Sequence, residues 1–191
     1  MKTIYLWTNE GWKPFDFDAE ETKLALKERN IQIGDSAEIG DSVKIGYSAK
    51  IGDFAKIGYS AEIGDSAKIG DYAKIGDSAK IGYSAEIGDS AKIGYSAEIG
   101  YSAEIGDSAE IGDYAEIGDK EIILKTIFIT GTKHSVLWYG KDVIHIGCHK
   151  KEISWWLENY EMIGRKEGYT DEEIQEYHQY ILICEAIQKT L

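Results

Sequence analysis

Residues 87–92 read Ile-Gly-Asp-Ser-Ala-Lys, and this six-residue unit repeats without interruption from Ile33 to Gly118. Isoleucine recurs at every sixth position, and a glycine follows each isoleucine. The fifth position of the unit is alanine in every copy except the one that carries Val43, and the sixth position is always glutamate or lysine. Self-similarity at a fixed period is typical of proteins built from stacked repeats.

The chemistry of the unit indicates one short strand and one corner. Alanine and isoleucine are two positions apart, so on an extended segment both point inward while the charged residue between them points outward. In the Gly-Asp-Ser corner we expect glycine to adopt unusual dihedral angles and aspartate and serine to bond to their own backbone. Stacking places identical isoleucines about 4.8 Å apart and buries them. A helix is excluded, because each glycine would cost roughly 1 kcal/mol relative to alanine.

This pattern resembles the repeat of the hexapeptide-repeat left-handed parallel β-helix superfamily, the fold of the trimeric hexapeptide transferases. Residues Ile87 to Lys92 match that repeat in full, and the neighbouring units match it as well. The resemblance implies three units per triangular coil, left-handed coiling, about five coils and a homotrimer. The expected fold class is mainly β, a single-stranded left-handed parallel β-helix with a cap at each end.

The domain organisation follows from where the repeat begins and ends. We expect an N-terminal cap in residues 1–32, the β-helix in residues 33–119 and a C-terminal α+β cap in residues 120–191. The aromatic segments around the Asn9-Glu10-Gly11 turn predict a hairpin, and Asp18 is the expected N-cap of a short helix.

The C-terminal cap combines strand and helix signals. Turn signals divide residues 122–147 into short strands. A first helix is predicted from Glu152 to Lys166, and a second follows the capping box formed by Thr170 and Glu173. Because a solenoid end exposes unpaired strand edges, we expect both flanking segments to act as covers.

Composition limits the partners of the chain. Its net charge of -13 disfavours nucleic acid and anionic membrane surfaces. The two cysteines, Cys148 and Cys184, are too few for a disulfide framework, and the N-terminal segment lacks the features of a signal peptide. We therefore expect a cytoplasmic protein without a cofactor. A protein or carbohydrate partner, and a place in a phage or surface appendage, are left open.

All four histidines lie in the C-terminal cap. His134 follows the predicted β-helix and is the candidate general base. His145, Cys148 and His149 form the densest group of metal-ligating residues and are candidate zinc ligands, although their spacing matches no standard zinc motif. The alternatives are a surface position for His134 and structural positions at the strand ends for the other three.

Stacking units three apart brings corner residues into columns. One column is made of aspartates only and is a candidate cation ladder; solvated turn aspartates are the alternative. The other two corners mix aspartate with tyrosine, and exposed tyrosines there are candidates for carbohydrate or protein contact. The aspartate column consists of Asp35, Asp53, Asp71, Asp89 and Asp107.

The sequence favours a non-catalytic structural or interaction protein, with the β-solenoid as a rigid scaffold and the C-terminal cap as an assembly or recognition unit. The repeat contains no histidine, whereas the resemblance implies that enzymes of the superfamily use a histidine from a coil or an inserted loop and bind acyl donors between subunits. The first alternative is an acyl-CoA-dependent acyltransferase that uses His134 at a subunit interface. The second is a carbohydrate- or surface-binding fibre module.

Overall fold

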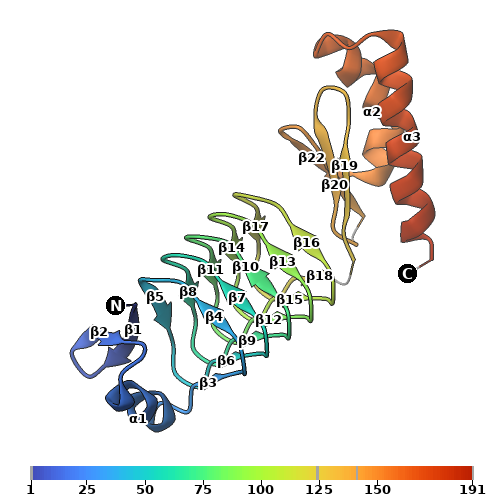
Figure 1. The fold of residues 1–191 in the computed structure, drawn as a ribbon. Coiled ribbons are helices and arrows are strands. Elements are labelled where there is room, and N and C mark those ends of the chain that lie inside the picture. The colour runs from blue at the N-terminus through green and yellow to red at the C-terminus, as the bar shows by residue number, and fades with distance from the viewer. Residues whose placement is uncertain (1, 124, 141, 191) are drawn as a thin grey trace. The chain divides into compact units, whose positions relative to one another are not determined.

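The computed structural model describes residues 2–123, 125–140 and 142–190. The chain divides into two compact units, Met1–Leu124 and Lys125–Leu191, each of which is described by itself (Figure 1). The first unit contains the solenoid with its N-terminal cover, and the second is a small α+β unit.

The repeat forms a parallel β-solenoid, as predicted. Its strands belong to three sheets, and neighbours within a sheet are 18 residues apart, as in the pairing of Ile33 with Ile51 and of Ile87 with Ile105. The sheet β16-β13-β10-β7-β4 passes through five successive coils (Figure 1). The strands are β3 (Gln32–Ile33), β4 (Glu38–Ile39), β5 (Val43–Ile45), β6 (Lys50–Ile51), β7 (Lys56–Ile57), β8 (Glu62–Ile63), β9 (Lys68–Ile69), β10 (Lys74–Ile75), β11 (Lys80–Ile81), β12 (Glu86–Ile87), β13 (Lys92–Ile93), β14 (Glu98–Ile99), β15 (Glu104–Ile105), β16 (Glu110–Ile111), β17 (Glu116–Ile117) and β18 (Ile122–Ile123).

Isoleucine and alanine fill the interior of each coil. Ile87 is 2% exposed and Ala91 is fully buried, and the apolar positions of the units are buried in the same way from Ile39 to Ile111. Backbone hydrogen bonds tie each coil to the next: the Gly88 N–H donates to the Ile105 carbonyl at 2.7 Å and the Ser90 N–H to the Asp71 carbonyl at 2.8 Å. Burial and hydrogen bonding therefore both depend on the presence of neighbouring coils, as expected for a repeat protein.

The glycine of the unit has a different role from the predicted one. The left-handed backbone angle belongs to the position after aspartate, for example Ser90 with a φ of 59°, and not to the glycine. At Gly88 an added Cβ would lie 2.5 Å from the Asp107 nitrogen in the next coil. Glycine is therefore required by the close approach of two backbones, and the prediction based on its dihedral freedom was wrong.

The N-terminal segment extends one sheet of the solenoid. Strands β1 (Thr3–Thr8) and β2 (Gly11–Asp16) form the predicted antiparallel hairpin, and β1 pairs in parallel with β5. Helix α1 (Glu20–Glu28) follows, with Ala19 rather than Asp18 at its N-cap and no side-chain cap. The hairpin covers a strand edge that the first coil would otherwise expose.

The C-terminal unit is a four-stranded antiparallel meander with two helices. Strands β19 (Ile127–Thr130), β20 (Ser135–Trp138), β21 (Val143–Ile146) and β22 (His149–Glu152) lie in sequence order. Helices α2 (Ile153–Lys166) and α3 (Asp171–Gln188) pack on the sheet face that carries Val136, Trp138, Ile144 and Ile146 (Figure 1). The predicted capping box of α3 is present, with the Thr170 side chain on the Glu173 N–H at 3.2 Å.

Two details of this unit differ from the prediction. Strand β22 was not predicted, because its sequence His-Lys-Lys-Glu lacks the apolar alternation of a half-buried strand. The apolar segment after residue 122 divides between β18, which continues the array, and β19. In the part of the chain that the structure describes, none of the helices combines the length and the apolar character that a membrane crossing needs.

Candidate functional site

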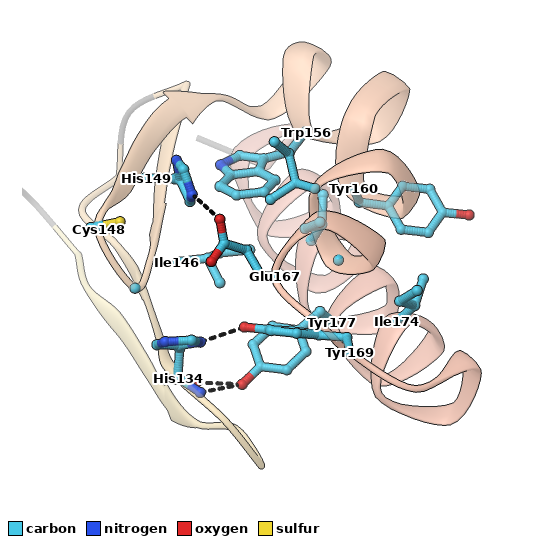
Figure 2. A pocket seen from close by; sticks show the side chains of 14 residues that line it. His134, Ile146, Cys148, His149, Trp156, Tyr160, Glu167, Tyr169, Ile174 and Tyr177 are labelled. Atoms are coloured by element: carbon cyan, nitrogen blue, oxygen red, sulfur yellow. Dashed lines mark hydrogen bonds and ion pairs between the residues drawn. The ribbon is translucent and has the colours of Figure 1, made fainter.

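A pocket lies within the C-terminal unit, between the ends of the sheet and the two helices (Figure 2). Its cavity volume is about 40 Å³. The helices and β21 provide apolar walls, including Ile146, Trp156 and Ile181. Polar groups complete the lining: His134, Cys148, His149, Glu167, Tyr169 and Tyr177.

The buried Tyr177 of α3 holds the turn that carries His134. Its hydroxyl accepts hydrogen bonds from the Lys133 N–H at 3.0 Å and the His134 N–H at 2.5 Å, and donates to the His134 carbonyl at 2.7 Å. Gly131 makes this possible, because a Cβ there would lie 2.5 Å from the Tyr177 hydroxyl. The backbone of His134 is therefore fixed on both sides, unlike that of an ordinary loop residue.

The imidazole of His134 is oriented by a second tyrosine. Its Nδ1 forms a hydrogen bond with the Tyr169 hydroxyl, and the two ring planes are inclined by only 12° (Figure 2). Burial, followed by the neighbouring Tyr177, raises the pKa of Tyr169, so its phenol stays protonated at neutral pH. Among the residues that the structure describes, Nε2 of His134 has no hydrogen-bond partner.

On the opposite side of the pocket, His149 faces a carboxylate. Its Nε2 lies 3.5 Å from Oε1 of Glu167, which is too far for a good hydrogen bond and within range of an ion pair (Figure 2). The ring of His149 also contacts the edge of Trp156 at a centroid distance of 6.3 Å. The contact between His149 and Glu167 is an ion pair only when the imidazole is protonated.

The three candidate zinc ligands do not share one face of the sheet. His149 pairs with Ile146 in the ladder and shares its helix-covered face, whereas His145 lies between the buried Ile144 and Ile146 and points to the other face. Cys148 is exposed in the turn between β21 and β22. Residues 2–123, 125–140 and 142–190 contain no group of three His, Cys, Asp or Glu side chains that could hold a metal ion.

The candidate cation ladder, the aspartate column, has a role in backbone hydrogen bonding. Oδ1 of Asp53 accepts the Asp35 N–H at 2.8 Å, and the same bond recurs from Asp53 to Asp71 and along the column to Asp89 and Asp107. The carboxylates of the last four residues of the column thus each satisfy an amide of the preceding coil. The outward charges also pair between coils, as in Lys80 with Glu98 at 2.6 Å.

The exposed aromatic residues at the corners pair with one another. Phe54 and Tyr72 stack at 5.0 Å with an angle of 6° between their planes, and Tyr83 and Tyr101 stack at 5.5 Å. Each ring of a pair therefore covers one face of its neighbour, the face on which a sugar would stack. This geometry gives no support to carbohydrate binding by the stacked faces.

Comparisons with known proteins found solved structures with a similar fold. No family model and no curated protein matches the chain. A variant of perosamine N-acetyltransferase from Caulobacter crescentus, solved with CoA and GDP-perosamine, is 19% identical with a TM-score of 0.44; the match covers 50% of this chain and 47% of that one. A hexapeptide transferase family protein from Anaplasma phagocytophilum is 15% identical with a TM-score of 0.30, over 84% and 92% of the two chains.

These matches are to proteins of the predicted superfamily. The fold is that of the hexapeptide-repeat β-helix proteins. This chain spans about half the length of the perosamine N-acetyltransferase it matches, 47%. The prediction of a non-catalytic structural protein is contradicted here, because the solved structures found for this fold are an acetyltransferase and a hexapeptide transferase.

Sequence reasoning found His134 but none of the groups that hold it. Tyr169 and Tyr177 lie 35 and 43 residues further along the chain. Glu167, which faces His149, lies 18 residues beyond that histidine. Tyr177 sits on the apolar face of α3 and reads there as a core residue. A buried tyrosine needs a hydrogen-bond partner for its hydroxyl, and this need is the feature of the sequence that could have pointed to a contact with Tyr177.

Proposed function

We propose that the chain is an acyltransferase whose reaction takes place at the pocket of the C-terminal unit, with His134 as the general base. The observation that carries this proposal is the fixation of His134: Tyr177 holds its backbone, Tyr169 holds Nδ1, and Nε2 is left for a substrate. A general base has to be positioned before its pKa matters, and this histidine is positioned. The neighbouring acetyltransferases of the same fold agree with this reaction class.

The proposed step needs one tautomer of His134. With the proton on Nδ1, the ring donates to the Tyr169 oxygen and Nε2 is a free base. Nε2 removes a proton from the acceptor's amine or hydroxyl group while that group attacks the thioester carbonyl carbon. The new C–N or C–O bond forms, the C–S bond breaks, and the proton passes from His134 to the departing thiolate.

The size of the pocket fits the transferred group and not the whole donor. A water molecule needs about 10–15 Å³ of such volume. The cavity of about 40 Å³ therefore has room for a few heavy atoms, which matches an acetyl group. The remainder of acetyl-CoA would lie outside the pocket, and the short acyl chain is the expected specificity.

Turnover of acetyl-CoA tests the proposal. The full chain is incubated with acetyl-CoA and a panel of amines and alcohols, and release of the free thiol is followed with a thiol reagent after protein removal. His134→Ala should lower the rate by about 10²- to 10⁴-fold, the range for a lost general base. The matched control His145→Asn changes a histidine on the other face of the sheet and should leave the rate unchanged. A rate that survives His134→Ala, or the absence of thiol release with every acceptor, contradicts the proposal.

The proposal includes the homotrimer that the fold resemblance implies. Light scattering of the full chain should then give a mass three times the 21.3 kDa of one subunit. A monomeric mass at micromolar concentration would remove the trimer from the proposal without affecting the role of His134, since all the pocket residues come from one C-terminal unit.

A further inference from the structure

We propose that the pocket selects an amine, bound in its ammonium form by the carboxylate of Glu167. This inference rests on the proposed function for its role in catalysis, and names the acceptor class of the same site. Among the described residues that line the pocket, Glu167 is the one with a permanent charge, and neither lysine nor arginine is present. A negative group in a lining that is otherwise neutral and largely apolar favours a cationic ligand.

The position of Glu167 in the fold strengthens this preference. Glu167 is the C-cap of α2, a helix of 14 residues, and its N–H donates to the Ile163 carbonyl at 2.9 Å. The C-terminus of a helix carries a partial negative charge, and this adds to the charge of the carboxylate. Two cations near this end of the helix are paired with other groups: Arg165 with Glu161 at 2.8 Å and Asp171 at 3.1 Å. Lys133 donates to the Gly168 carbonyl at 3.1 Å and lies 3.6 Å from the Glu173 carboxylate.

Aromatic side chains provide a second source of attraction for a cation. Trp156, Tyr160, Tyr169 and Tyr177 line the same small pocket. A cation near an aromatic face is stabilised by the negative charge of the π system, more strongly where water is excluded. The cavity of about 40 Å³ has room for a few heavy atoms, so beside an acetyl group it would admit the ammonium nitrogen, and the carbons of the amine would extend outside.

The two histidines give the ammonium a path to reaction. His149 lies 3.5 Å from Glu167, so a neutral imidazole leaves the carboxylate free to pair with a ligand. An ammonium ion is not a nucleophile and must lose a proton before it attacks a thioester. His134 lines the same pocket, so its Nε2 would take that first proton, release it to water, and then remove the second proton during the attack. Glu167 would thus bind the acceptor and His134 would activate it.

Binding of n-butylammonium chloride tests the inference, with n-butanol as the neutral probe of matched size. Both are titrated into the full chain without an acyl donor, and the amide signals of Gly147 and Gly168 are followed by NMR. The ammonium ion should bind about tenfold more tightly than the alcohol, from a partly exposed ion pair and a cation–π contact. Glu167→Gln should reduce this preference to less than twofold.

The matched control is Glu158→Gln, which removes an exposed carboxylate from the same helix and should leave both affinities unchanged. Equal affinity for the two probes, no binding of either, or a preference that survives Glu167→Gln would overturn the inference. Because no acyl donor is present, this result is independent of acetyl-CoA turnover. Ammonium binding without turnover refutes the acyltransferase alone, whereas turnover with alcohols and without ammonium binding refutes the amine acceptor alone.

Discussion

The solenoid allows a direct test of why glycine occurs in every unit. Gly76 and Gly112 occupy the same position of the repeat and neither has a positive φ. A Cβ added to Gly76 would lie 2.6 Å from both the carbonyl carbon and the oxygen of Gly94. At Gly112 nothing lies within 4 Å of the added atom. Gly76→Ala and Gly112→Ala are therefore the same chemical change, but only at Gly76 would the added methyl group collide with the backbone of the next coil.

The expected cost follows from the bonds that the added carbon would break. Ordinary carbon contacts begin near 3.4 Å, so the next coil would have to move by roughly 0.8 Å at Gly76. Hydrogen bonds there include the Gly76 N–H to the Ile93 carbonyl at 2.8 Å and the Ser96 N–H to the Asp77 carbonyl at 2.9 Å. Loss of two or three such bonds destabilises the protein by about 1–4 kcal/mol. Gly112→Ala should instead stabilise it by about 0.4–1 kcal/mol, because the unfolded chain loses freedom.

Urea denaturation followed by circular dichroism measures both variants against the parent chain. Equal slopes for the three proteins justify a comparison of midpoints, which matters because long repeat arrays can depart from two-state unfolding. A lower midpoint for Gly76→Ala together with an equal or higher one for Gly112→Ala is expected. If both variants lose the same stability, then glycine is required for its dihedral freedom or its flexibility, and the close approach of the coils is not the cause.

Two further predictions concern the array and the cysteines. Deletion of residues 70–87 removes one full coil of 18 residues and preserves every column of stacked residues. The shortened chain should therefore give the same circular dichroism spectrum per coil and the same acetyl-CoA turnover. Loss of folding or of activity would refute this modularity. Burial raises the pKa of Cys184 to about 11, whereas Cys148 is exposed. A thiol reagent at pH 8 should therefore modify only Cys148 in the native chain and both cysteines in denaturant. Modification of Cys184 in the native protein would contradict the structure.

The period of the repeat was sufficient to predict the solenoid, because each Ile and Ala needs an inward position and only stacked strands provide it for all of them. It was not sufficient for the role of single positions. Glycine at Gly88 and serine at Ser90 both belong to a corner, and the sequence does not distinguish a residue that needs a left-handed angle from one that must lack a Cβ. That distinction depends on the distance to the next coil, which is a property of the packed structure.

The pocket was less predictable for a related reason. His134 could be singled out as a histidine in a turn, but its value as a base depends on Tyr169 and Tyr177, which meet it through tertiary contacts over 35 and 43 residues. The candidate zinc ligands are separated by strand β22, since a strand there places His145 and His149 on opposite faces of the sheet. The spacing of residues in the sequence predicts whether their side chains converge only when the secondary structure between them is known.

The location of the pocket also changes what the regularity of the repeat implies. The array has no histidine, and this was the reason to expect a structural protein. All residues of the pocket, however, lie between His134 and Ile181, within the compact unit Lys125–Leu191. Gain or loss of a whole coil would leave every contact of His134, Tyr169, Tyr177 and Glu167 intact. A change in the number of coils is therefore compatible with the proposed catalytic site, because the two lie in units with separate cores.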